Sequence, residues 1–190
     1  MNKVVYLKKE CLQEDAYSRK LYFDFLDYAF SKADYFMLVY VNYYGKGYTN
    51  QQKHFRDSLK KFKVKSRNNP SWPGTPKTFS RGTTYKITFY KTSEDAKEIL
   101  KEVSCLSSWS RPINPEDLAF FKGNQCWFYS TGHEKIAAII HADNEDIEFL
   151  ISKGLATREA VSIPTDNYFD SYNEPISEVK NRHDTGDSSL

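Results

Sequence analysis

The sequence predicts a single α+β domain with a mixed or antiparallel sheet, a C-terminal three-stranded meander and about four packing helices. Short strand-like runs separated by turn residues lie close together between residues 115 and 140, which favours antiparallel neighbours. Elsewhere, segments with apolar residues at helical spacing alternate with further strand-like runs. With 190 residues, 39% of them hydrophobic and 27% charged, the chain is long enough to bury a core.

The first half of the domain is expected to begin with a helix over residues 13–30. The apolar stripe of this helix comprises Tyr22, Phe25, Leu26, Ala29 and Phe30. Residues 34–42 follow as a strand that is apolar on both faces, which favours a central place in the sheet. A basic helix is expected over residues 50–63, with Phe55, Leu59 and Phe62 directed inward. Residues 66–80 contain three prolines and are expected to be an irregular loop.

A second strand and helix are predicted after that loop. Residues 83–91 alternate between apolar and polar side chains, as a half-buried strand does. Thr92 is expected to cap the following helix, whose first turn carries Glu94 and Asp95. The stripe of this helix comprises Ala96, Ile99, Leu100, Val103 and Leu106.

The meander and a final helix complete the domain. Residues 115–121, 126–131 and 136–140 form its three strands, and Asp143 is expected to cap a helix that ends at Gly154. Trp127 is expected to be buried against the helix that carries Ile99 and Val103. The domain is therefore assigned to residues 1–156.

Residues 157–190 are expected to form an acidic C-terminal extension. Its last ten residues have almost nothing apolar to bury, which indicates disorder. Tyr168, Phe169 and Tyr172 are expected to tether its first half to the body of the protein. Truncation after Glu178 should therefore leave folding intact.

Charge is unevenly distributed along the chain. Residues 46–91 contain twelve lysines or arginines and a single acid, Asp57, whereas the remainder contains fifteen basic and twenty-four acidic residues. Such a block could bind phosphates or an acidic protein, or it could be a solvated helix face neutralised by the acidic extension. The candidate binding residues are Lys60, Lys61, Lys63, Lys65, Arg67, Tyr43, Tyr44, Tyr48 and Trp72.

Trp72 stands apart among these candidates because it precedes Pro73-Gly74, a pair that favours a type II turn. Its ring could anchor the loop to the body or form an exposed hot spot for a partner. The anchor is the favoured interpretation.

Catalytic residues are sparse. Ser130, His133 and Glu134 lie together at a turn near Cys126, and acyl transfer needs such groups, but triad members usually come from separate segments. His133, Glu134 and His141 lack the spacing of a metal site, and Cys11, Cys105 and Cys126 form neither a metal pair nor a disulfide framework. No catalytic residue, metal or cofactor is therefore assigned.

The compartment is expected to be a reducing cytoplasm. The longest apolar run, residues 35–41, is far shorter than the roughly 20 residues of a spanning helix. The N-terminus lacks the apolar core of a secretion signal. No membrane partner is expected.

Several short motifs carry a resemblance. The Trp72-Pro-Gly-Thr loop, the Pro115-Glu-Asp-Leu opening, and Trp127 followed by His133-Glu134 are similar to small uncharacterised proteins of Gram-positive bacteria. Some of these carry a sporulation-stage label, and others resemble immunity proteins that accompany polymorphic toxins. The likeness covers residues 34–155. It implies a binding protein rather than an enzyme, and it transfers no functional residue.

Three functions follow from these observations, in decreasing order of preference. The first is a non-catalytic protein-binding module, such as a toxin immunity protein or a phage-type inhibitor of a bacterial defence or nuclease protein. The alternative is a nucleic-acid-binding protein that uses the basic block 46–91. A second alternative is a small hydrolase or transferase that uses His133.

Overall fold

The computed structural model describes residues 3–78, 80–163 and 172–176, and these form one α+β domain around an eight-stranded antiparallel sheet. The strand order is β3-β4-β2-β5-β6-β7-β1-β8. The bounds are β1 (Val4–Tyr6), β2 (Tyr35–Asn42), β3 (Lys63–Asn68), β4 (Thr84–Lys91), β5 (Glu116–Lys122), β6 (Gln125–Thr131), β7 (Ile136–Ile140) and β8 (Val161–Ser162). The predicted fold class is confirmed.

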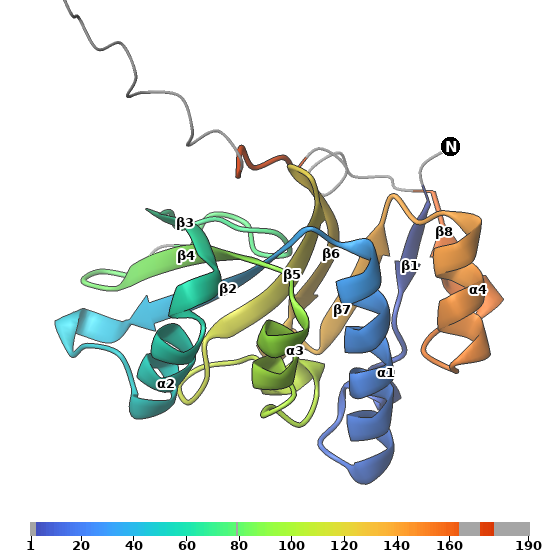
Figure 1. Ribbon diagram of the computed structural model, residues 1–190, viewed down its shortest axis with the longest axis horizontal. Helices are drawn as coiled ribbons and strands as arrows, with labels where there is room; N and C mark the ends of the chain where they lie inside the picture. The colour runs from blue at the N-terminus through green and yellow to red at the C-terminus, as the bar shows by residue number, and fades with distance from the viewer. Residues whose placement is uncertain (1–2, 79, 164–171, 177–190) are drawn as a thin grey trace, which may run out of the picture.

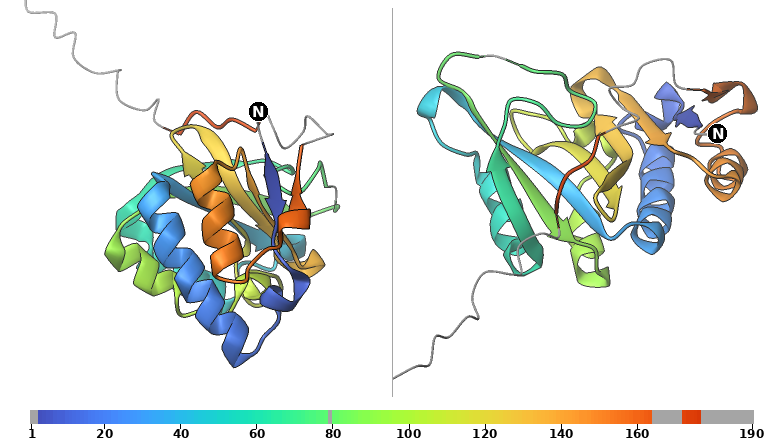
Figure 2. Two further views of the ribbon diagram at one scale, coloured as in Figure 1. Left: turned by 90° about the vertical axis from the view of Figure 1, so that its right-hand side faces the viewer. Right: turned by 90° about the horizontal axis from the view of Figure 1, so that it is seen from above.

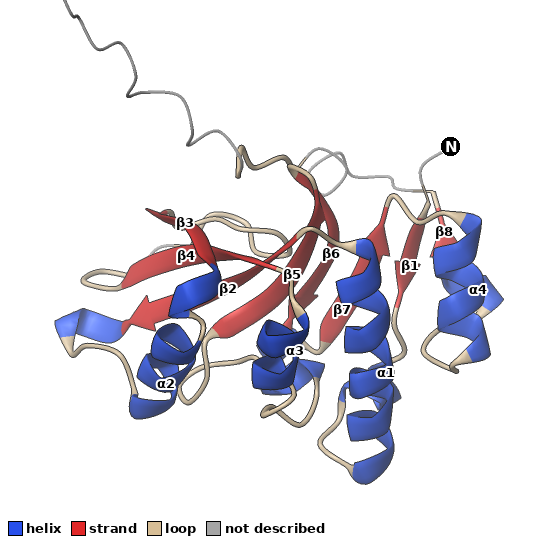
Figure 3. Ribbon diagram, viewed as in Figure 1, coloured by secondary structure: helices blue, strands red, loops and turns tan. Residues whose placement is uncertain are grey.

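Four helices lie on one side of this sheet (Figures 1 and 3). They are α1 (Ala16–Lys32), α2 (Asn50–Ser58), α3 (Glu94–Leu100) and α4 (Asn144–Ser152). Asp15, Thr49, Ser93 and Asp143 each accept a hydrogen bond at a helix N-terminus, and Asp146 completes a capping box at α4. No helix among the described residues is both long and apolar enough to cross a membrane.

The larger part of the core lies between these helices and the sheet. Phe25 of α1 packs on Phe128 of β6 with ring centroids 4.5 Å apart. Trp109 is fully buried beside Phe55 of α2 and donates its indole N–H to the Tyr22 hydroxyl at 3.0 Å. Such burial of large aromatic side chains is the main driving force for folding.

Trp127 is buried as predicted, but against other helices than expected. Its indole N–H donates to Asp146 of α4 at 3.0 Å, and its ring contacts that of Tyr28 of α1. The expected helix α3 lies between α2 and α1 in Figure 1, on the side of α1 away from α4. The side chains that cover Trp127 therefore come from α1 and α4.

The opposite face of the sheet carries a second apolar cluster, which includes Val39, Ile87 and Phe121. No described helix covers this face (Figure 2). Trp72 from the loop between β3 and β4 and Ile176 from the C-terminal segment cover it instead, and both are buried. We call residues 172–176 the C-terminal strap.

Several predicted elements differ from the structure. The basic helix expected over residues 50–63 ends at Ser58, and Lys63 begins the edge strand β3 after a short 3-10 turn. The expected loop 66–80 therefore starts inside a strand. The stripe predicted to run to Leu106 belongs to a helix that ends at Leu100, and Ser93 rather than Thr92 caps it, because Thr92 donates to the Ala33 and Asp34 carbonyls.

The C-terminal extension is described only in part. Tyr168, Phe169 and the residues after 176 lie outside the described residues, so their expected roles are not addressed. Tyr172 does contact the body, since its ring lies 6.4 Å from that of Phe121.

Candidate functional site

An irregularity in β3 divides the basic block between the two faces of the sheet. Lys63 pairs with Tyr90 of β4, and Lys65 pairs with the adjacent Phe89, so the register shifts at Val64. Paired residues of neighbouring strands point to the same face. Lys63 thus shares the helix-covered face with Tyr90, whereas Lys65 shares the opposite face with Phe89.

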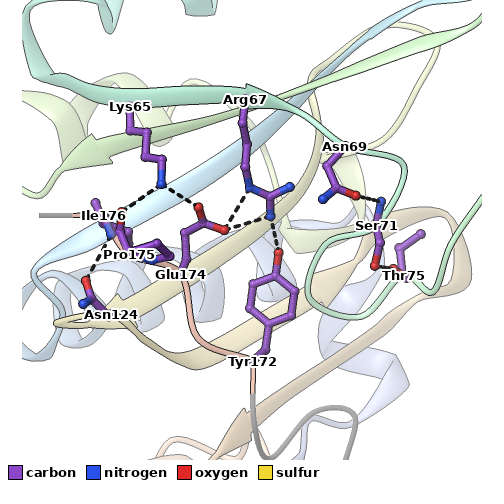
Figure 4. A network of polar contacts seen from close by, with 10 residues as sticks. All are labelled: Lys65, Arg67, Asn69, Ser71, Thr75, Asn124, Tyr172, Glu174, Pro175 and Ile176. Carbon is purple, nitrogen blue, oxygen red and sulfur yellow. Dashed lines mark hydrogen bonds and ion pairs between the residues drawn. The ribbon is translucent and has the colours of Figure 1, made fainter. Parts of the chain in front are cut away.

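On the helix-free face, the C-terminal strap pairs one carboxylate with the two basic side chains Lys65 and Arg67. Figure 4 shows Glu174 between Lys65 and Arg67. Its Oε1 accepts from Lys65 Nζ at 3.0 Å, and its Oε2 accepts from Arg67 Nε at 2.9 Å. Arg67 also donates to the Tyr172 hydroxyl at 2.6 Å. The part of the basic block on this face is therefore occupied within the chain.

Backbone contacts hold the strap in place beside the β5–β6 turn. The Tyr172 carbonyl accepts from the Cys126 N–H at 3.0 Å, and the Glu174 N–H donates to the Asn124 carbonyl at 2.8 Å. The Ile176 N–H donates to Asn124 Oδ1 at 3.1 Å, and the Ile176 side chain is fully buried. The Glu174 carboxylate is thus presented to Lys65 and Arg67 by a fixed backbone.

On the helix-covered face, four other basic side chains line an open pocket of about 310 Å³. The pocket lies between α2, the 3-10 turn that follows it, and strands β2, β3 and β4. We call it the basic pocket. It is lined by Tyr40, Tyr48, Arg56, Asp57, Lys60, Lys63, Ser66, Lys86, Thr88 and Tyr90.

The basic pocket holds four cationic side chains and one carboxylate. Asp57 is already engaged, because its Oδ1 accepts from Arg56 Nε at 2.9 Å. Within the described part of the chain, Lys60, Lys63 and Lys86 have no acidic side chain within ion-pair distance. A surplus of positive charge therefore lines a concave, water-accessible surface.

Two pairs of hydroxyl groups also line the basic pocket. The hydroxyls of Tyr40 and Tyr90 lie 2.6 Å apart, and those of Ser66 and Thr88 lie 3.0 Å apart. Burial raises the pKa of both tyrosines well above the ordinary value. These phenols therefore stay protonated and keep their ability to donate.

The remaining predicted binding residues are in different situations. Lys61 lies outside the pocket and pairs with Asp95 of α3 at 2.8 Å. Arg111 lies over the Tyr43 ring at 5.3 Å, whereas Tyr44 is 66% exposed and Tyr48 lines the pocket. The structure thus gathers Lys60, Lys63 and Tyr48 and separates the others.

Trp72 is an anchor and not an exposed hot spot. It is 2% exposed and donates its indole N–H to Asp117 Oδ2 at 2.7 Å. Gly74 has a φ of 80°, and a side chain there would overlap the Tyr129 ring. The assignment of Trp72 as a stacking residue is therefore wrong, because no face of its ring is open to a partner.

The local group around His133 is not arranged as a triad. The Ser130 hydroxyl donates to the Leu118 carbonyl at 2.9 Å and accepts from the Leu118 N–H. His133 instead lies beside Glu116, with Nδ1 3.5 Å from its Oε1, and beside Glu134. The described contacts therefore give Ser130 a structural role in the β5–β6 pairing.

Two adjacent buried carboxyls near His133 escaped the sequence reasoning. Burial is the main cause that raises the pKa of Glu116 to about 7 and that of Asp117 to about 6. Asp117 accepts from Trp72, from Thr75 and from the Gly132 N–H at 2.9 Å, so it ties two loops together. Glu116 pairs with Arg111 at 3.2 Å.

No metal-binding cluster of three or more histidine, cysteine or acidic side chains occurs among the described residues. Comparison with known proteins does not supply an assignment either, since no family model, no curated protein and no solved structure matches the chain. The function has to be argued from the site itself.

Seven of the ten pocket residues were missing from the predicted site: Tyr40, Arg56, Asp57, Ser66, Lys86, Thr88 and Tyr90. Arg56 and Lys86 belong to the basic block, which the composition identified. The composition did not predict that these two side chains line one pocket. Tyr40 and Tyr90 read as ordinary strand residues. Only the β2–β4 pairing, together with the position of α2, brings them to one place.

Proposed function

We propose that the protein is a non-catalytic protein-binding module, such as a toxin immunity protein or a phage-type inhibitor of a bacterial defence or nuclease protein. The partner is expected to present an acidic surface to the face of α2 and β3 that carries the basic pocket. The observation that supports this most directly is the contrast in charge compensation. Lys65 and Arg67 both pair with the Glu174 carboxylate, whereas Lys60 and Lys63 pair with no carboxylate of the described residues.

The strap gives a local example of the recognition proposed. A short segment with one carboxylate binds two basic side chains of β3 and adds backbone hydrogen bonds and one buried apolar side chain. An acidic segment of another protein could satisfy Lys60 and Lys63 in the same manner. The exposed ring of Tyr44 lies on the loop that leads into α2 and could add an aromatic contact.

Nucleic acid is the less favoured partner. A nucleic-acid surface needs a track of cations and open aromatic faces. Lys65 and Arg67, which would lengthen such a track, are engaged by the strap, and Trp72 is buried. Arg111 also covers the Tyr43 ring.

The proposal is tested by charge reversal at the partner interface. Proteins that co-purify from the native host are identified, and each is then purified and titrated with the wild type and with Lys60→Glu/Lys63→Glu. We expect a defined complex that the double variant weakens about tenfold or more. Reversing acidic residues on the partner should restore binding. Lys53→Glu is the matched control, because Lys53 is an exposed residue of α2 outside the pocket.

A salt titration with random duplex and single-stranded nucleic acid distinguishes nucleic-acid binding from binding of an acidic protein. Micromolar binding at physiological salt, with a log-linear decrease of about 0.9 per duplex phosphate contact, would favour nucleic acid. Partner binding that is insensitive to Lys60→Glu/Lys63→Glu would refute the proposed interface.

A further inference from the structure

We propose that the basic pocket is also a binding site for a small organic molecule that carries a phosphate monoester. This inference goes beyond the protein-binding function, and either proposal can fail alone. It rests on the charge, the hydroxyl donors and the volume of the pocket.

The charge of the pocket matches a dianion. Arg56, Lys60, Lys63 and Lys86 carry four positive charges, and Asp57 carries one negative charge. A phosphate monoester near pH 7 carries about 1.5 to 2 negative charges and three strong acceptor oxygens. A carboxylate or a phosphodiester carries one charge and would leave more of the lysines uncompensated.

The buried hydroxyls supply a donor that an oxyanion can use. The four hydroxyls form one chain, because Tyr90 has a side-chain hydrogen bond with Thr88 in addition to the Tyr40–Tyr90 and Ser66–Thr88 bonds. Three bonds use three of the four protons, so one O–H of the chain remains available. For Tyr40 and Tyr90, both 1% exposed, the raised pKa keeps the phenol protons in place, and an anion in the pocket would accept from the available O–H.

The volume of the basic pocket is large enough for an organic group in addition to the phosphate. A pocket of about 310 Å³ lies near the lower limit of sites for small organic ligands, roughly 300 to 1,000 Å³. Its lining combines lysines with three tyrosine rings, and Tyr40 and Tyr48 meet edge to face with centroids 6.2 Å apart. An aromatic or ribose-like group could pack on these rings while the phosphate reaches the lysines.

The register shift at Val64 makes the site distinct from the strap. It directs Lys63 and Ser66 into the pocket, and it directs Lys65 and Arg67 to the face where Glu174 binds. Glu174 therefore does not occupy the basic pocket. The positive charge on the pocket side is left for a ligand from outside the described chain.

The test is isothermal titration of the full chain with adenosine 5′-monophosphate and phenyl phosphate at low salt. Adenosine, benzoate and inorganic phosphate are the comparison ligands. We expect a dissociation constant of about 0.01–1 mM for the two monoesters, and at least about tenfold weaker binding of each comparison ligand.

Three variants locate the site. Lys63→Gln and Lys86→Gln should each weaken monoester binding about tenfold, and Tyr40→Phe should weaken it about threefold. Lys61→Gln is the matched control. It removes the same charge from the 3-10 turn that precedes Lys63 but lies outside the pocket, so monoester binding should change less than about twofold.

Thermal melting shows that each variant is folded, and the exposed or half-exposed lysines keep the test valid if Tyr40→Phe is unstable. Several results would overturn the proposal. They are no monoester binding at 10 mM (about 2.7 kcal/mol), equal binding of inorganic phosphate or benzoate, an equal loss in Lys61→Gln, or tighter binding of a single-stranded oligonucleotide. None of these results bears on whether an acidic protein binds the same face.

Discussion

The two faces of strand β3 carry similar lysines and arginines but treat them differently. On the helix-free face, Lys65 and Arg67 are 22% exposed and meet the Glu174 carboxylate. On the helix-covered face, Lys63 lines a water-accessible pocket together with Lys60 and Lys86, and within the described part of the chain it meets no carboxylate. The comparison shows that some basic side chains of one run can pair within the chain while others remain able to bind a partner. The strand register determines to which group each side chain belongs.

The largest expected effect on this comparison is the difference in stability between the Arg67→Ala and Lys63→Ala variants. Removal of Arg67 leaves the nearly buried Glu174 with one cation fewer and removes the hydrogen bond that Arg67 donates to the Tyr172 hydroxyl. We expect the free energy of unfolding to fall by about 2–3 kcal/mol. Lys63→Ala should change it by no more than about 0.5 kcal/mol, because Lys63 is exposed and unpaired among the described residues.

Urea unfolding at pH 7 measures both values. The double variant Arg67→Ala/Glu174→Gln should recover about 1 kcal/mol of the loss, because it no longer buries a carboxylate that has lost one of its two cationic partners. Equal effects of Arg67→Ala and Lys63→Ala would show that the strap does not distinguish the two faces.

The buried pair Glu116 and Asp117 sharpens the comparison, because burial outweighs the contacts that these two carboxyls receive and raises their pKa values. Their raised pKa values, about 7 and about 6, mean that the folded state binds protons more tightly than the unfolded state. Stability from this pair is therefore greatest at low pH and is lost as the pH rises from about 4 to about 7. Arg111 and His133 lie against Glu116 and moderate this loss.

Melting temperatures of wild type and Glu116→Gln between pH 5 and pH 8 check this expectation. The wild type should lose several degrees relative to the variant as the pH rises, at about 2–4 °C for each kcal/mol. His133→Gln in both backgrounds separates the contribution of the imidazole. A difference between wild type and variant that does not change with pH would contradict the assignment.

The smallest effect is expected from truncation after Glu178. The truncated chain retains Glu174 and Ile176, and residues 179–190 have few apolar side chains to bury. The melting temperature should change by less than about 2 °C. A chain that ends at Asp170 lacks the strap and should be clearly less stable, so a similar melting temperature for both truncated chains would deny the strap a structural role.

Sequence reasoning succeeded where one segment alone fixes the outcome. The two-sided apolar pattern of residues 35–42 predicted a central strand, and β2 does lie between β4 and β5. Asp143 was predicted as a helix cap, and Pro73-Gly74 predicted an anchored turn at Trp72. In each case the local side chains carry the information.

Prediction from the sequence failed where an element is determined by contacts with residues that are distant in the sequence. Strand β3 is almost entirely polar and continues a basic helix in the sequence, so its pairing with β4 has no periodic signature. The register shift at Val64 exists only relative to Tyr90 and Phe89. The strap joins Arg67 to Glu174 across 107 positions, and charge counting indicated neutralisation without identifying the residues.

The fluorescence of the three tryptophans can report on local unfolding in three parts of the molecule. Trp72, Trp109 and Trp127 are all buried, and their indole N–H groups bond to Asp117, Tyr22 and Asp146 respectively. Trp72 belongs to the β3–β4 loop and packs on the helix-free face of the sheet, Trp109 lies beside α2, and Trp127 lies beneath α1 and α4. Each indole becomes exposed to water only when the elements packed on it unfold locally. The fluorescence of single-tryptophan variants would therefore show whether the helices or the β3–β4 loop separate from the sheet first.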